Sequence, residues 1–181
     1  SLAHNNIGPD GARAIADALM LNMTVVSISL RGNPIEDEGG IALGTMVRGN
    51  NTLVSLDLGN CGLATKSLVS IVQALMTHPA LCAIHLDKPL LKGPHDIQYV
   101  IQHLANTIQR STVLVEVSMD HWQLYDDHLG SLLPALVQNS SITRFSVAGN
   151  KLSMDGGILL AKLLNRRPDM TSLSAHSNNI N

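Results

Sequence analysis

Residues 25–35 read VVSISLRGNPI, and the rest of the chain repeats their pattern. Aliphatic side chains occupy Val25, Ile28, Leu30 and Ile35, and Asn33 stands between the last two. The pattern returns as LVSLDLGNCGL at residues 53–63 and as ITRFSVAGNKL at residues 142–152. The positions equivalent to Asn33 are 5, 33, 61, 89, 122, 150 and 178, which are 28 residues apart except for one step of 33. Such regular spacing indicates a chain built from stacked repeats.

Each repeat is expected to contain a short strand followed by a helix. Residues 27–31 alternate between polar and apolar side chains, which is the period of a strand with one buried face. After the asparagine, apolar residues recur at helical spacing, as in Ala12, Ile15, Ala16 and Leu19. One repeat is too small to bury a core alone, so neighbouring repeats must stack. We therefore expect residues 1–181 to form a single domain of about six repeats.

The pattern LxxLxLxx[N/C]xL with a 28-residue period resembles the ribonuclease-inhibitor class of leucine-rich repeats over the whole chain. That class favours glycine six residues after the asparagine, which three repeats keep as Gly11, Gly39 and Gly156. The other repeats carry Ser67, His95 and His128 there. The resemblance implies an α/β solenoid, a horseshoe arc with parallel strands on the concave face and helices on the convex face. Because the chain starts and stops inside a repeat without a polar cap, we expect a fragment of a longer array that lacks both caps.

The 33-residue step interrupts the pattern. Its five extra residues fall around Lys88–His95, and they either lengthen the helix expected from about 95 to 110 or form a bulged loop. Pro89 and Trp122 occupy the two asparagine positions that border the step. An indole is much larger than the side chain that it replaces, so it must find an internal partner or point outward. We favour a drifted repeat, with an exposed Trp122 that anchors a partner as the alternative.

The outward-facing residues of successive strands should form columns across the concave face. Four such columns are expected. The first two are Ser27, Ser55, Ala83, Glu116, Arg144, Ser172 and Ser29, Asp57, His85, Ser118, Ser146, Ser174, and the other two begin at Arg31 and at His4. Charged and imidazole side chains gather over the central strands. The candidate partner-binding strip consists of Arg31, Asp57, His85, Asp87, Lys88, Glu116, Asp120 and His121.

Three interpretations of this strip remain open. It is a solvated polar surface, a surface that binds another protein, or a metal site. His85, Asp87, Asp120 and His121 are the ligand types that zinc or manganese prefers. An open sheet face, however, offers no enclosed pocket, which argues against the metal site.

Composition narrows the function classes. The formal net charge of −2 argues against nucleic acid or an anionic membrane as the partner. Two cysteines, Cys61 and Cys82, cannot form a disulfide framework, so a reducing, cytoplasmic location is expected. No GxSxG, P-loop or HExxH motif is present, so we predict neither an enzyme nor a cofactor.

We therefore predict a protein–protein interaction module of the scaffold, sensor or inhibitor type that binds another protein through its concave face. It is expected to be monomeric in isolation, with end-to-end stacking as an option. The resemblance also suggests an alternative, because the same repeat class includes the Ran GTPase-activating protein. No residues of this chain can be matched to that activity, so the alternative rests on the fold alone.

Overall fold

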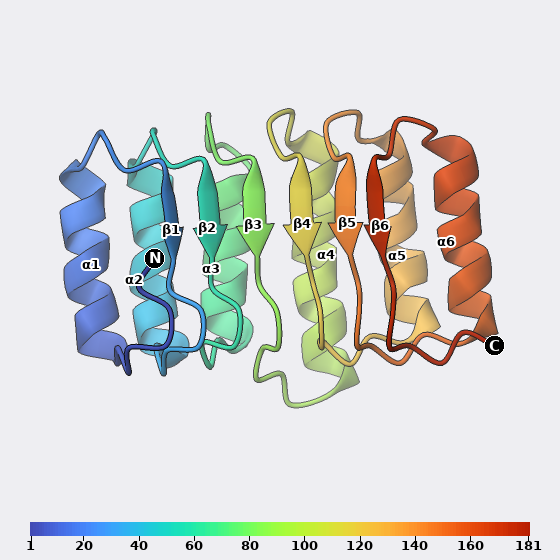
Figure 1. Ribbon diagram of the computed structural model, residues 1–181, viewed down its shortest axis with the longest axis horizontal. Helices are drawn as coiled ribbons and strands as arrows, with labels where there is room; N and C mark the ends of the chain where they lie inside the picture. Colours follow the sequence, from blue (N-terminus) through green and yellow to red (C-terminus); the bar gives the residue numbers. More distant parts are fainter.

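The computed structural model describes all residues 1–181 and forms a two-layer α/β solenoid (Figure 1). Helices and strands alternate along the chain from α1 to β6, and the strands pair in parallel in the order β1-β2-β3-β4-β5-β6. The helices are α1 (Pro9–Leu21), α2 (Glu36–Gly49), α3 (Thr65–Leu75), α4 (Pro94–Arg110), α5 (Asp126–Gln138) and α6 (Met154–Arg166). The strands are β1 (Ser27–Ser29), β2 (Ser55–Asp57), β3 (Ala83–His85), β4 (Glu116–Ser118), β5 (Arg144–Ser146) and β6 (Ser172–Ser174). The leucine-rich repeat solenoid expected from the sequence is confirmed.

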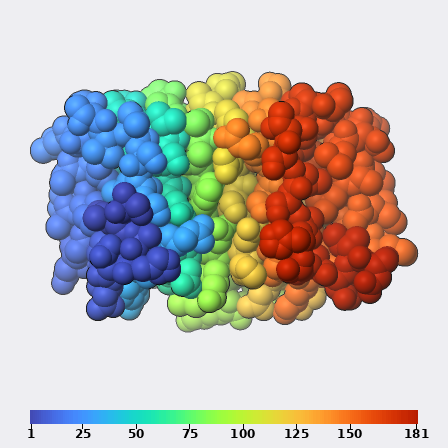
Figure 2. All heavy atoms as spheres, viewed as in Figure 1, coloured from blue at the N-terminus to red at the C-terminus, as the bar shows by residue number.

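The strands pair in the register that the repeat predicts. Ser27 pairs with Ser55 and Ser29 with Asp57, and each further pairing continues both columns up to β6. The register survives the long step, because Ala83 pairs with Glu116. The face of the sheet opposite the helices, here called the concave face, is turned toward the viewer in Figure 2. Successive repeats cross it as bands of colour from blue to red.

The core is one continuous apolar layer between the sheet and the helices. It contains 42 buried residues, almost all aliphatic, and the middle residue of each strand from β2 to β5 contributes to it. Ile28 is buried while Ser27 and Ser29 on either side are not, which is the alternation that the sequence indicated. The rings of Trp122 and Phe145 are the largest side chains that are fully buried.

In repeats that keep the asparagine, its side chain links the end of its own strand to the end of the strand before it. The Asn150 amide donates to the carbonyl of Val147 at 2.8 Å and to that of Met119, one repeat earlier, at 3.1 Å. Cys61 takes the same place in its repeat, where its Sγ lies 3.1 Å from the carbonyl oxygen of Leu30. Burial raises the pKa of the Cys61 thiol to about 11, so it remains neutral.

Carboxylates also link neighbouring repeats at helix N-termini. Asp37 of α2 accepts from the backbone N–H of Ser67 at 2.8 Å in the first turn of α3. Asp126 of α5 accepts from the backbone N–H and the hydroxyl of Ser153, the residue that caps α6, at 2.9 and 2.5 Å. Such acceptors satisfy N–H groups that have no partner inside the helix.

Trp122 is buried, contrary to the alternative of an exposed anchor. Its side chain is only 1% exposed, and its indole Nε1 donates to the carbonyl of Leu86 at 2.8 Å. In the repeats of Asn33 and Asn150, the asparagine donates to the carbonyl three residues before it. Residue 89 would donate to Leu86 in the same way, but Pro89 has no side-chain donor. The indole therefore provides the hydrogen bond from the next repeat. Because the ring lies inside the core, the hypothesis that Trp122 is an exposed anchor for a partner is not supported.

The extra residues of the long step mainly lengthen a helix. Helix α4 has 17 residues, whereas α5 and α6 have 13 each, so four additional residues amount to about one turn. In Figure 1, the loop that leads from β3 into α4 extends below the neighbouring loops. No helix of the chain is long and apolar enough to cross a membrane.

The buried position of Trp122 predicts a large effect on stability. Trp122→Ala should lower the free energy of unfolding by about 3–5 kcal/mol, because it leaves a cavity and removes the donor to Leu86. Urea unfolding followed by circular dichroism measures the change. Lys66→Ala, at an exposed position on α3, is the control and should be nearly neutral. A loss below about 1 kcal/mol for Trp122→Ala would show that the indole is not part of the packed core.

Candidate functional site

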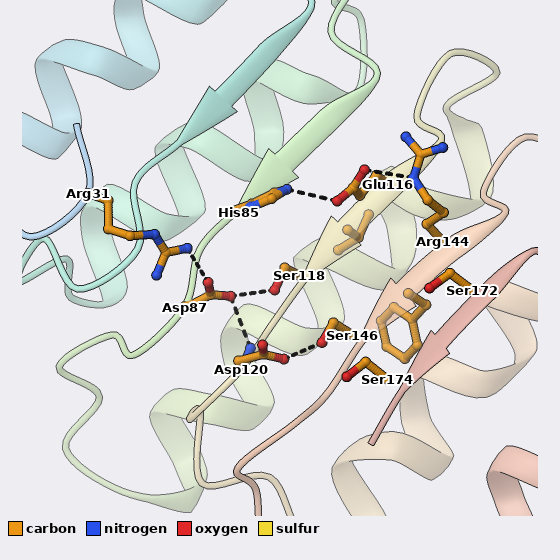
Figure 3. Close-up of a pocket in the computed structure, with 12 residues that line it drawn as sticks. Arg31, His85, Asp87, Glu116, Ser118, Asp120, Arg144, Ser146, Ser172 and Ser174 are labelled. Atoms are coloured by element: carbon orange, nitrogen blue, oxygen red, sulfur yellow. Dashed lines mark hydrogen bonds and ion pairs between the residues drawn. The ribbon is translucent and has the colours of Figure 1, made fainter. Parts of the chain in front are cut away.

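Polar side chains from successive repeats surround a hollow on the concave face (Figure 3). The hollow measures about 420 Å³ and lies over the central and C-terminal strands. Its polar lining consists of Arg31, His85, Asp87, Glu116, Ser118, Asp120, Arg144, Ser146, Ser172 and Ser174. The structure therefore brings together five of the residues predicted from the sequence, namely Arg31, His85, Asp87, Glu116 and Asp120.

Arg31 reaches across two repeats to bind two carboxylates. Its Nε donates to Oδ2 of Asp57 at 3.0 Å, and its Nη2 donates to Oδ2 of Asp87. The guanidinium passes over Gly59, where an added Cβ would lie 2.4 Å from its Cζ atom. A side chain at this position would collide with the guanidinium, so the bond to Asp87 depends on a glycine in the intervening repeat. Asp57 lies next to the hollow and supports Arg31 from outside it.

The three aspartates accept hydrogen bonds from the sheet itself. Asp87 Oδ1 accepts from the Ser118 hydroxyl at 2.5 Å and from the backbone N–H of Asp120 at 3.1 Å. Asp120 Oδ1 accepts from the Ser146 hydroxyl at 2.5 Å and from the next repeat's backbone. Asp57 accepts from the Ser29 hydroxyl at 2.9 Å. Only 8% of the Asp87 side chain is exposed, so the main role of this carboxylate is to orient its neighbours.

The carboxylate of Asp57 is held in its charged form. Burial on its own would raise its pKa, but the hydrogen bonds from Arg31, the Gly59 N–H and the Ser29 hydroxyl outweigh this effect. The pKa of Asp57 therefore lies below its usual value of 3.8.

Glu116 forms the second charged cluster, with a partner on each neighbouring strand. His85 Nε2 lies 3.0 Å from Glu116 Oε1, and Arg144 Nε donates to Oε2 at 2.7 Å. Burial would raise the pKa of Glu116, but the hydrogen bond from Arg144 and the electrostatic interaction with His85 lower it overall. The side chains of His85, Glu116 and Arg144 are 31%, 29% and 45% exposed, so this cluster remains accessible to a ligand.

Arg144 was not among the residues predicted for the candidate strip. It stood in the same predicted column as Glu116, one strand away, and that pairing of opposite charges was the signal that could have identified it. The hydroxyls of Ser118 and Ser146 were also missed, since serine alone gives no sign of its role.

Lys88 and His121 lie outside the hollow. Both are exposed and follow their strands with positive φ values of 53° and 58°. The ring of His121 lies over Gly149 of the next repeat, where an added Cβ would be 2.2 Å from the ring. These two residues form an edge beside the hollow and do not belong to its lining.

The structure does not bring metal ligands together. No group of three or more His, Cys, Asp or Glu side chains is arranged to hold a metal ion. His85 turns to Glu116, Asp87 turns to Arg31 and Ser118, and Asp120 turns to Ser146. The structure therefore does not support the hypothesis of a metal site at His85, Asp87, Asp120 and His121.

Comparison with known proteins agrees with this fold. The sequence model of the family described as "Leucine Rich repeat" matches residues 1–16, 21–44 and 49–72. The mouse leucine-rich repeat-containing protein 34 is 33% identical over 105 residues, which are 58% of this chain and 25% of that protein. The mouse NACHT, LRR and PYD domains-containing protein 5 is 28% identical over 151 residues, covering 83% of this chain and 13% of that protein. The chain has the leucine-rich repeat fold that these matches indicate, and it spans a quarter or less of the length of these relatives.

Two solved structures share the arrangement of helices and strands. Leiomodin-1 actin-binding site 2 superposes with a TM-score of 0.71 at 12% identity, over 88% of this chain and 89% of that one. The C-terminal domain of tropomodulin from Caenorhabditis elegans gives a TM-score of 0.67 at 13% identity, over 87% and 93% of the two chains. These likenesses concern the fold. The leucine-rich repeats and the repeat-containing relatives, in turn, support a protein-interaction module.

The hydrogen bonds of Asp87 predict that it supports the fold. Asp87→Ala should lower the free energy of unfolding by about 2–4 kcal/mol, because Arg31, Ser118 and the Asp120 N–H all lose an acceptor. Glu116→Ala, at a more exposed ion pair, should cost less than about 1 kcal/mol. Urea denaturation of both variants gives the comparison. Equal losses of stability in the two variants would contradict the conclusion that Asp87 supports the fold while Glu116 remains accessible.

The lowered pKa of Asp57 predicts a pH dependence. A carboxylate with a depressed folded-state pKa contributes stability above its unfolded pKa, and this contribution is lost as pH falls through the folded value. Asp57→Asn should therefore be less stable than the parent by about 1 kcal/mol at pH 7. The difference should shrink as the pH falls below 3.8. Unfolding curves at several pH values test this, and a difference that does not change with pH would contradict the charged interaction.

Proposed function

We propose that this chain binds another protein through the concave face, with the hollow around Arg31, His85, Glu116 and Arg144 as the main contact. The observation that carries the proposal is the gathering of accessible charged groups on a rigid sheet. Their side chains are 29–45% exposed, and each is held by a partner on a neighbouring repeat. Preorganised polar groups lose little conformational entropy on binding, which favours specific recognition.

The two arginines keep donors available for a ligand. Arg144 uses Nε to bind Glu116, so neither of its terminal nitrogens is engaged. Arg31 uses Nε and Nη2, which leaves Nη1. A guanidinium binds carboxylates and carbonyl groups through such N–H groups. We therefore infer that the partner inserts an acidic or carbonyl-bearing segment into the hollow, beside the hydroxyls of Ser172 and Ser174.

The remaining members of the strip have two roles in this proposal. Asp57, Asp87 and Asp120 position the arginine and the serines, because they accept hydrogen bonds from the sheet. Lys88 and His121 provide exposed polar groups at the rim. A rim of this kind mainly sets specificity and the rate of association.

The comparisons support a protein as the class of partner. Leiomodin-1 shares the fold and is named for an actin-binding site, but 12% identity gives no basis for assigning actin as the partner here. We infer that residues 1–181 act as one domain of about six repeats within the cytoplasm. Within a larger protein it would serve as a scaffold, a sensor or an inhibitor.

Charge reversal at accessible positions tests the proposal. The parent protein and an Arg144→Glu, Lys88→Glu variant are used to capture partners from cell extract. The matched control is Arg48→Glu, Lys66→Glu, which makes the same charge change at exposed positions of α2 and α3. A specific partner should be retained at least tenfold less by the concave variant, while the control should retain it normally.

Stability must be compared at the same time. The concave variant should lose no more than about 1 kcal/mol of stability through the exposed Arg144–Glu116 ion pair, and the control should unfold as the parent does, because none of the four positions is buried. If the convex control loses the partner and the concave variant keeps it, the concave face is not the binding surface. Crosslinking from a photoreactive residue at Ser172 should then also fail to label the partner.

A further inference from the structure

A second surface lies on the convex side, in a groove between α5 and α6. Its C-terminal part encloses about 460 Å³ and is lined by Leu133, Pro134 and Val137 of α5 and by Lys162 and Arg166 of α6. Leu133 and Val137 are only partly buried, and Pro134 is exposed. Apart from Gln138, the remaining lining consists of the side chains of the two cations, whose aliphatic stems extend an apolar surface.

The two cations of this groove are not neutralised within the chain. Lys162 and Arg166 are exposed, lie four residues apart on α6, and have no carboxylate within ion-pair distance. Arg166 lies in the last turn, where the helix dipole favours a positive charge. Lys162 lies one turn earlier, so the dipole does not account for it. Two adjacent unpaired cations beside apolar side chains fit a ligand that is both apolar and acidic.

The opposite end of the groove carries the opposite charge. There a hollow of about 610 Å³ is lined by Asp127, Asp155, Ile158 and Leu159, and Lys162 belongs to both hollows. Asp126 caps the α6 N-terminus through Ser153, whereas Asp127 and Asp155 form no ion pair. The groove is therefore acidic at one end, apolar along its length and basic at the other end.

The groove exists because α5 and α6 approach each other less closely than helices elsewhere in the chain. An added Cβ at Gly44 of α2 would lie 2.3 Å from Oγ of Ser70 on α3, so these helices are in intimate contact. At Gly130 of α5, the nearest atom to an added Cβ is Cδ1 of Leu159, at 3.8 Å. The space between α5 and α6 is therefore open to solvent.

We propose that the α5–α6 groove docks an amphipathic helix with an apolar face and acidic residues at one end. Both helices have 13 residues, which corresponds to a groove of about 20 Å, or nearly four turns of a ligand helix. The apolar residues of that helix, spaced at i, i+3, i+4 and i+7, would lie against Leu133, Val137 and Leu159. Its acidic end would pair with Lys162 and Arg166. Asp127 and Asp155 repel an anionic bilayer, which favours a peptide over a membrane surface.

A displayed library of 16-residue helices tests this proposal. The library keeps apolar residues at i, i+3, i+4 and i+7 and randomises the other positions, and it is selected against the intact chain. Selected peptides should be enriched in Asp and Glu at one end. Their affinity, measured by fluorescence anisotropy, should fall at least tenfold for Lys162→Glu, Arg166→Glu. The matched control, Arg48→Glu, Lys66→Glu, should bind as the parent does.

Other outcomes would overturn the proposal. These are the absence of any enriched peptide, enrichment without an acidic bias, or equal binding by the Lys162→Glu, Arg166→Glu variant and the parent. Vesicles of phosphatidylcholine and phosphatidylserine form the second arm. Binding of the chain to them, lost in the same variant, would assign the groove to a membrane instead. Circular dichroism and thermal unfolding confirm that the exposed substitutions leave the fold intact.

Discussion

No repeat of this protein supplies hydrogen-bond partners for all of its own buried backbone carbonyls, and this constraint underlies the entire structure. The amide of Asn150 reaches back to Met119, the thiol of Cys61 to Leu30, and the indole of Trp122 to Leu86. In each case, an inward polar group from one repeat supplies a donor to a carbonyl of the repeat before it. Because buried carbonyls need partners, the repeats must remain in register. That register places the outward side chains in columns.

Much of the architecture could be predicted from the sequence, because a fixed period determines which residues lie side by side. The pairing of Ala83 with Glu116 could be assigned despite the long step, since the strand pattern resumes after it. Trp122 was harder to place. Its size left two options, an internal partner or an outward position. The hydrogen-bonding requirement at Leu86 and the lack of a donor on Pro89 account for the internal one.

The details of the candidate site could be predicted only in part. The columns indicated which charges would be neighbours, but not which side chains would bind one another. Arg31 binds Asp57 of the adjacent repeat and also reaches Asp87 two repeats away, which depends on its length and on the space above Gly59. Arg144 was predicted to lie beside Glu116, but its part in a cluster with Glu116 and His85 is evident only from the structure. Side-chain contacts of this kind depend on three-dimensional packing, and the repeat pattern of the sequence does not reveal them.

The bond between Arg31 and Asp87 also has a consequence for how the solenoid loses its structure. In most stacked repeats, each unit contacts only its immediate neighbours, so fraying proceeds one unit at a time from an end. Here, loss of the first strand removes a guanidinium that the third strand depends on, and the hollow loses part of its wall while β3 and β4 are still folded. Local order in the repeat that carries Arg31 thus affects the shape of a surface two repeats away, and the proposed binding surface is sensitive to whatever stabilises or loosens that repeat.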